Sequence, residues 1–212
     1  MEVILPLLVG FGITFCTTLL PGLLNMTAAK VSVREDRRNA LIFAVGAATV
    51  VLFQSYIAVT FAKFINRRPD IVDLLQEIGV LIFFMLTIYF LLIAKKKKPK
   101  AADAVVKARS KTGNFFVGMA LSAINFFPIP FYVFLSISLS AMKIFFFTNF
   151  YIFFFVIGAT GGAFLVFYLY IAFFKKFQHR TEFFMRNVNY FIGSITGIVA
   201  VVTLLKIWKS HF

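Results

Sequence analysis

One short stretch of the chain combines a helix breaker with a carboxamide inside a long uncharged segment. It reads "TTLLPGLLNM", in which Asn25 follows Pro21 and Gly22. Proline has no backbone N–H and clashes with the preceding helical turn, and glycine adds flexibility, so we expect a helix to break here. A break frees backbone polar groups, and the N-terminal end of the helix that follows it suits a carboxylate. The chemistry predicted for this stretch is therefore the binding of a small polar molecule.

The second half of the chain carries a similar combination. It reads "LSAINFFPIPFYVF" and contains Asn125, Pro128 and Pro130. A lone proline in a membrane helix more often makes a kink than a site. Two interruptions in corresponding helices, each with an asparagine, favour a binding site between them.

Other polar residues of the uncharged segments are further candidates. Gln54 needs a hydrogen-bond partner, which a neighbouring helix or a substrate could supply equally well, and we place it with the substrate-binding residues. Thr17 and Thr18 precede the first break, and we expect them to bond carbonyls freed by it more readily than a substrate. Tyr56 and Tyr168 are second-tier candidates beside the pathway.

The composition indicates which elements must position these residues. Of the 212 residues, 61% are hydrophobic and only 14% are charged, whereas a soluble domain is nearer half apolar and a quarter charged. A membrane-spanning helix needs about 20 apolar residues. We therefore predict an all-α integral membrane protein whose six transmembrane helices lie at 3–29, 39–62, 72–94, 115–142, 144–174 and 188–205.

The net charge of +14 is concentrated in three predicted loops. Loops 30–38, 95–111 and 175–186 hold 16 of the 22 basic residues, so the positive-inside rule places them in the cytoplasm and both termini outside. The most basic loop, 95–111, is interpreted as a topology anchor that can attract anionic lipid head groups. No aromatic or glycine-rich RNA-binding pattern accompanies it, so we do not expect a nucleic-acid partner.

The two proline-containing stretches belong to a predicted internal repeat. Segment 43–64 aligns without a gap with segment 155–176, and a slightly smaller offset brings Pro21 opposite Pro128. Each half then holds three helices, and because three is odd the second half crosses the membrane in the opposite sense. We predict one transporter domain over residues 1–212, with inverted three-helix repeats at about 1–94 and 112–212 joined by the basic loop.

At these residues the chain resembles the lysine exporter (LysE/RhtB) family of bacterial amino-acid transporters. The matching features are "LLPGLLNM", the loop "REDRR", Gly46 of the second span and "INFFPIP". The chain is similar to a divergent member, because Leu23 replaces the second proline of the family's first motif, and Phe126 and Phe127 separate the second asparagine from its proline. The resemblance implies a location in the bacterial cytoplasmic (inner) membrane and the export of amino acids or related small metabolites.

We therefore expect a secondary transporter that works by alternating access of its two halves. No acidic residue lies in the middle of a predicted span, so a second positive charge on a substrate would lack a partner, and a neutral amino acid suits the site better than lysine or arginine. Its carboxylate would lie on the helix ends near Pro21 and Pro128. A non-transporting accessory or lipid-handling subunit is the alternative, but it does not explain two matched breaks.

An enzyme is not expected. The two histidines, His179 and His211, lie in a predicted loop and at the C-terminus, and no cluster with metal-ligand spacing occurs in the spans, so no cofactor or metal is predicted. Asp73 and Glu77, at the outer end of the third span, are interpreted as a solvated cap or an external gate. The glycines of the fifth and sixth spans indicate close helix packing, which could also serve a homodimer.

Overall fold

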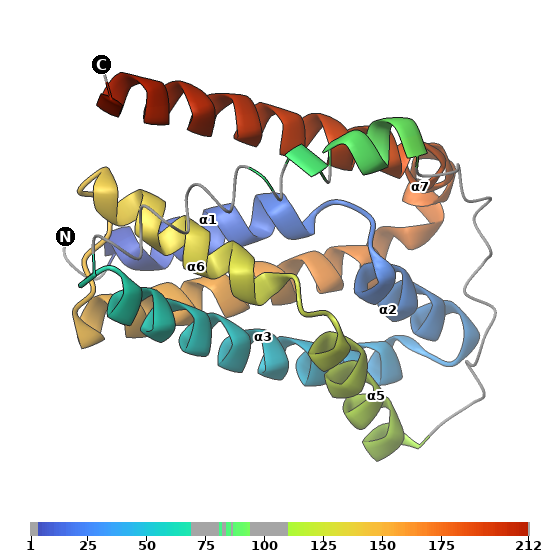
Figure 1. The fold of residues 1–212 in the computed structure, drawn as a ribbon. Helices are drawn as coiled ribbons and strands as arrows, with labels where there is room; N and C mark the ends of the chain where they lie inside the picture. The colour runs from blue at the N-terminus through green and yellow to red at the C-terminus, as the bar shows by residue number, and fades with distance from the viewer. Residues whose placement is uncertain (1–3, 69–80, 82–83, 86, 94–109, 212) are drawn as a thin grey trace. The chain divides into compact units, whose positions relative to one another are not determined.

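The computed structural model describes residues 4–68, 81, 84–85, 87–93 and 110–211 (Figure 1). In these ranges the chain is helical and contains no strand. The helices are α1 (Ile4–Thr18), α2 (Leu23–Arg34), α3 (Arg37–Ile65), the π-helical turn η1 (Tyr89–Ile93), α5 (Lys111–Ile124), α6 (Pro128–Ala141) and α7 (Asn149–His211). Most of the predicted third span, with Asp73 and Glu77, and nearly all of the basic loop 95–111 lie outside the described residues.

The chain divides into two compact units. The first comprises Met1–Phe64 and Ala102–Phe177, and the second comprises Ile65–Ala101 and Gln178–Phe212. The first unit holds α1, α2, α5 and α6, together with nearly all of α3 and the first part of α7. It therefore contains both proline-containing stretches. In the second unit, Gly193 packs against Leu91 and Gly197 against Thr87.

Both predicted helix breaks are confirmed. α1 and α2 are bent by 76° across the residues around Pro21, and α5 and α6 are bent by 61° just before Pro128. α3 and the Asn149–Phe173 part of α7 are each long and apolar enough to cross a membrane. Among the described residues there are therefore two candidate spans, or four if each bent pair forms one span.

The predicted loop at 175–186 is wrong, because α7 continues through it as one helix from Asn149 to His211. Basic residues suggested a loop, but this part of the chain contains neither glycine nor proline to end a helix. The predicted loop at 30–38 is also too long. α2 extends to Arg34, and only Glu35 and Asp36 precede α3, where the Asp36 carboxylate accepts from the backbone N–H of Asn39 at 2.6 Å.

Small residues bring the helices of the first unit into backbone contact. α3 crosses α5, and α1 crosses α7, each through a reciprocal pair of glycine contacts. These contacts are Gly46 with Phe115, Gly118 with Phe43, Gly10 with Phe155, and Gly158 with Leu7. A Cβ on any of the four glycines would overlap the carbonyl oxygen that it faces, so these positions fix how closely the helices approach.

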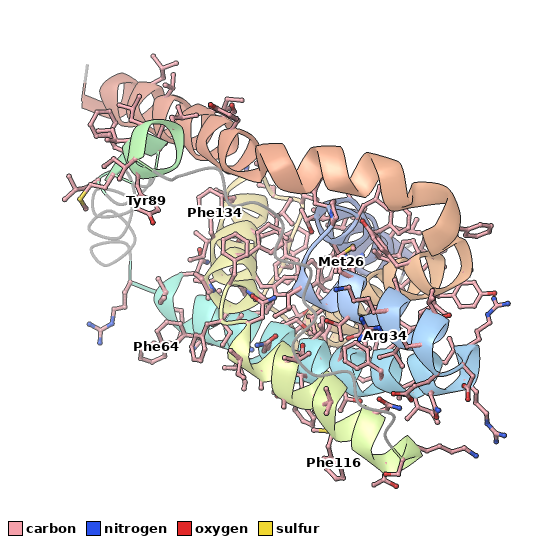
Figure 2. The ribbon with its side chains drawn as sticks, turned by 90° about the vertical axis from the view of Figure 1, so that its right-hand side faces the viewer. Met26, Arg34, Phe64, Tyr89, Phe116 and Phe134 are labelled. Carbon is pink, nitrogen blue, oxygen red and sulfur yellow. The ribbon has the colours of Figure 1, made fainter. Side chains whose placement is uncertain are left out.

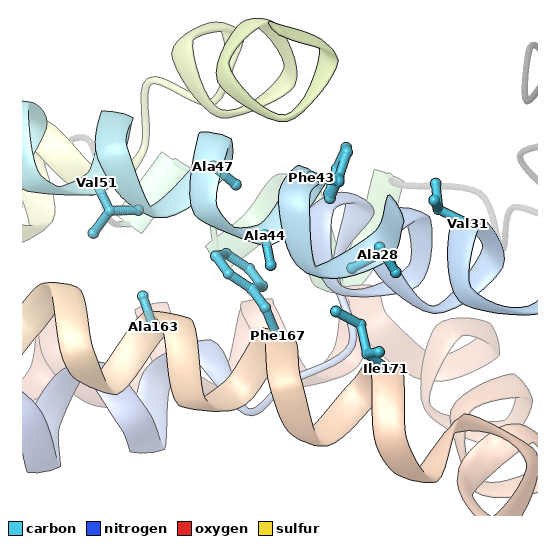
Figure 3. Close-up of a cluster of buried hydrophobic side chains, with 10 residues drawn as sticks. Ala28, Val31, Phe43, Ala44, Ala47, Val51, Ala163, Phe167 and Ile171 are labelled. Atoms are coloured by element: carbon cyan, nitrogen blue, oxygen red, sulfur yellow. The ribbon is translucent and has the colours of Figure 1, made fainter. Parts of the chain in front are cut away.

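The core of the first unit lies between α2, α3 and α7. Figure 3 shows Ala44 of α3 facing the ring of Phe167 of α7, and Phe43, Ala47 and Ala28 belong to the same cluster. Large aromatic side chains also cover the outside. Phe64 and Phe116 are 64% and 60% exposed and lie on the outer surface of α3 and α5 (Figure 2), as expected of side chains that face lipid.

Candidate functional site

Side chains satisfy the backbone carbonyls that the first break sets free. Asn25 Nδ2 donates to the carbonyls of Thr18 and Leu20 at 2.7 and 2.9 Å. The hydroxyl of Tyr170, on α7, donates to the carbonyl of Leu19 at 3.0 Å. Non-helical backbone at membrane depth needs such partners, so the C-terminal end of α1 is closed to a ligand.

The N-terminal end of α2 is open. Gly22 precedes the helix without a side-chain cap, and the first helical bond runs from the N–H of Met26 to the carbonyl of Gly22 at 3.0 Å. Within the described residues, the N–H groups of Leu23, Leu24 and Asn25 make no recorded hydrogen bond. Free N–H groups and the positive end of the helix dipole make this end suited to an anion.

At the second break an amide from another helix satisfies the carbonyls. Gln54 Nε2, on α3, donates to the carbonyl of Asn125 at 3.0 Å and to that of Ser122 at 3.3 Å. Gln54 and Ser122 are both buried, and the side-chain oxygen of each has no partner among the described residues. The C-terminal end of α5 therefore presents acceptors that are still unused.

The N-terminal end of α6 lacks the free donors expected near Pro128. Pro128 and Pro130 have no N–H. Ile129 donates its N–H to the carbonyl of Phe126 at 3.2 Å, and Phe131 donates to the carbonyl of Phe127 at 3.3 Å. No N–H remains in this turn for a carboxylate.

The two breaks are consequently complementary. At the first break the carbonyl end is capped and the N–H end is open. At the second break the N–H end is blocked, and unused oxygens lie beside the carbonyl end. The free N–H groups at the first break suit a negatively charged group, and the unused oxygens at the second suit a hydrogen-donating group. The first break also has one buried oxygen, Asn25 Oδ1, without a partner among the described residues.

Several predicted site residues have other positions or partners. Thr17 does not bond a freed carbonyl, because its hydroxyl donates to the Ile13 carbonyl at 2.9 Å within α1. Thr18 contributes its backbone carbonyl to the first break. Asn125 contributes its backbone carbonyl to the second break, and its side chain is exposed. Tyr56 and Tyr168 lie apart: Tyr56 is 52% exposed in the second half of α3, whereas the Tyr168 hydroxyl accepts from Arg37, the first residue of α3, at 2.8 Å.

Sequence reasoning missed Ser122 and Tyr170. The repeat favoured Tyr168 because it aligns with Tyr56, but Tyr170, two residues later and so on another face of α7, reaches the break. Ser122 lies one helical turn beyond Gly118, on the face of α5 that meets α3, and "LSAIN" gave only this weak signal.

A further polar contact, partly buried, lies at the end of the unit where α2 meets α3. Asn114 of α5 is 1% exposed and donates from Nδ2 to Glu35 Oε2 at 2.6 Å. It ties the short connection between α2 and α3 to the first turns of α5. This contact is distinct from both breaks.

A groove of about 430 Å³ lies between α3 and α7, and no residue of either break lines it. Its lining includes Val45, Leu52 and Phe53 of α3 and is almost entirely apolar. Its two threonines, Thr49 and Thr160, donate their hydroxyls to carbonyls of their own helices at 2.9 and 2.8 Å. The groove therefore offers little polar recognition, and the breaks are the better candidate site.

A family model described as "LysE type translocator" matches residues 15–206. No curated protein and no solved structure matches the chain.

Proposed function

This chain belongs to the LysE type translocator family, and we propose that it exports neutral amino acids or related small metabolites across the bacterial cytoplasmic (inner) membrane. The family consists of translocators rather than enzymes. In the proposed mechanism two inverted halves expose a shared site to one side of the membrane at a time, with both termini outside. The accessory-subunit alternative is not carried forward, because it has no support from the family match.

The observation that carries this proposal is the open N-terminal end of α2. A carboxylate there would accept from the N–H groups of Leu23, Leu24 and Asn25, none of which has another recorded partner in the described part of the chain. Charge-assisted hydrogen bonds of this kind are each worth about 1.5–3 kcal/mol. Asn25 would act mainly through the backbone, because its Nδ2 group already holds the carbonyls on the other side of the break.

The glycine crossings support the proposal of two inverted halves. The alignment of 43–64 with 155–176 equates Phe43 with Phe155 and Gly46 with Gly158. At each crossing the carbonyl of the aligned phenylalanine faces a glycine of the other helix. The aligned glycine in turn faces a carbonyl three residues before that other glycine. Exchanging the two halves therefore maps the two α3–α5 contacts onto the two α7–α1 contacts, as a two-fold pseudo-symmetry requires.

An efflux assay tests the proposed function. Proteoliposomes are loaded with a panel of neutral, acidic and basic amino acids, and with the amides of the best neutral substrates. We expect efflux of neutral amino acids and little efflux of their amides, which lack the carboxylate. Asn25→Ala keeps the backbone N–H but leaves the carbonyls of Thr18 and Leu20 at the break without their donor, so it should abolish efflux. Thr27→Ala, two residues along α2 and outside the break, should not.

Size-exclusion profiles of both variants establish that they are folded. Absence of efflux for every amino acid, or lysine export that survives Asn25→Ala, would refute the proposal. Equal efflux of amides and free acids would refute the carboxylate site.

A further inference from the structure

Two oxygen atoms beside the second break are buried and unpartnered. Gln54 is 6% exposed and Ser122 is 1% exposed, and within the described residues neither Gln54 Oε1 nor Ser122 Oγ has a hydrogen-bond partner. Buried polar groups are nearly always paired, and leaving one unpaired is unfavourable. Gln54 Oε1 can only accept, so a donor is missing beside it, and the Ser122 hydroxyl nearby can both donate and accept.

The orientation of the Gln54 amide follows from its contacts. Nε2 faces the carbonyls of Ser122 and Asn125 at 3.3 and 3.0 Å. A flipped amide would direct its oxygen at two carbonyl oxygens, which would repel it. Oε1 is therefore the free atom, and it can only accept.

We propose that Gln54 Oε1 and Ser122 Oγ bind the ammonium group of the transported amino acid. This inference rests on the proposed function and adds a binding site for the second charged group of the substrate. The carboxylate would lie on α2 and the ammonium group at the end of α5. An ammonium group has three donors and no acceptor, so it matches a site made only of oxygen atoms. The carbonyl of Asn125 retains a second lone pair for the third donor.

The charge at this end also suits a cation. The C-terminal end of α5 carries the negative end of its helix dipole, equivalent to roughly half an elementary charge. It has no basic residue in its last turn, and the helix that follows begins with two prolines. A substrate that brings its own carboxylate to α2 needs no acidic residue here, whereas a second ammonium group would have no counter-charge.

Residues next to both proposed binding groups pack against one core cluster. Leu24 of α2 and Leu121 of α5 both pack against the cluster that contains Val51 of α3. Asn25 follows the first of these leucines, and Ser122 follows the second. The open end of α2 and the acceptors on α5 therefore border one core cluster within the same compact unit.

Ser122→Ala is the decisive variant, because it deletes a hydroxyl that has no hydrogen-bond partner in the described part of the chain. Its stability should be unchanged or slightly higher, since an unpaired buried hydroxyl does not stabilise the fold. Its affinity for a neutral amino acid should fall about tenfold, the effect of one charge-assisted hydrogen bond. The matched control is Ser136→Ala, which removes an equally buried hydroxyl that donates to the Tyr132 carbonyl at 2.7 Å.

Binding is measured on purified protein as the ligand-induced shift in melting temperature. Each variant is titrated with the amino acid that the wild type exports and with its α-hydroxy acid analogue, in sodium and in choline buffer. We expect the wild type and Ser136→Ala to prefer the amino acid, and Ser122→Ala to lose most of that preference in both buffers.

Three outcomes overturn the inference. If Ser122→Ala and Ser136→Ala prefer the amino acid over its α-hydroxy acid analogue to the same extent, the Ser122 hydroxyl does not bind the ammonium group. A change confined to sodium dependence assigns the oxygens to a sodium ion instead. A wild type that neither binds nor exports any amino acid overturns the proposed function as well, whereas either of the first two results leaves it standing.

Discussion

The glycine contacts between α1 and α7 allow a prediction in which one variant serves as the control for another. Gly158 and Gly161 lie one turn apart on α7. A Cβ on Gly158 would overlap the backbone carbonyl of Leu7, whereas a Cβ on Gly161 would meet only the ring of Phe11, at an ordinary contact distance of 3.7 Å. The same contrast exists on α1 between Gly10 and Gly12, since nothing lies within 4 Å of a Cβ on Gly12.

The expected magnitude follows from two opposing terms. Alanine in place of a helical glycine stabilises a helix by roughly 0.5–1 kcal/mol. An added methyl group in a tightly packed contact costs about 1–3 kcal/mol, and a backbone carbonyl cannot move aside as a side chain can. The first term is common to both variants, so the difference between Gly158→Ala and Gly161→Ala isolates the second. We expect Gly158→Ala to be about 1–3 kcal/mol less stable than Gly161→Ala.

Reversible unfolding in mixed micelles, followed by circular dichroism, measures this difference. Gly10→Ala against Gly12→Ala gives an independent estimate, because its control lies on the other helix of the crossing. Equal stability within either pair would contradict the close approach of α1 and α7. It would also remove the main support for two symmetry-related crossings.

Three further predictions concern buried or partly buried hydrogen bonds of the first unit. Tyr170→Phe removes the donor to a carbonyl of the first break and should lower the free energy of unfolding by about 1–3 kcal/mol; no loss of stability would show that the carbonyl finds another partner. Asn114→Ala leaves a buried carboxylate oxygen without its donor and should destabilise by about 1–3 kcal/mol, and adding Glu35→Gln should recover part of that loss, as measured by thermal denaturation. The hydroxyls of Thr14 and Tyr132 are 3.0 Å apart and join α1 to α6, so a double-mutant cycle with Thr14→Val and Tyr132→Phe should give a coupling energy of at least about 0.5 kcal/mol; a value near zero would exclude the bond.

The sequence was sufficient to locate the helix breaks because their cause is local. A proline removes an N–H and clashes with the turn before it, whatever surrounds it. The apolar runs containing α3 and the first part of α7 were predictable for a similar reason, since length and hydropathy decide them. The loop expected at 175–186 failed because charge does not end a helix, and the segment has no residue that does.

The partners at the breaks could not be predicted, because they are tertiary contacts. Nothing near Leu19 in the sequence indicates that the hydroxyl of Tyr170 caps its carbonyl. Gln54 was a candidate for its polarity alone, and only the structure pairs it with the carbonyls of Ser122 and Asn125. Asn25 was expected to bond a substrate, but its Nδ2 group is already occupied by the break that it follows.

The register of proline relative to the next helix decides what each break can bind. Pro21 lies two residues before α2 begins, so the first turn of α2 keeps all of its N–H groups. Pro128 is the first residue of α6 and Pro130 is the third, so that turn loses two donors, and its neighbours use the others. A shift of about two residues thus decides whether the first turn of the helix keeps free N–H groups. In the proposed mechanism, recognition at the second break is left to the oxygens of Gln54 and Ser122. In the proposed mechanism, the N–H groups of the first break and the oxygens of the second would together bind a molecule with one charge of each sign.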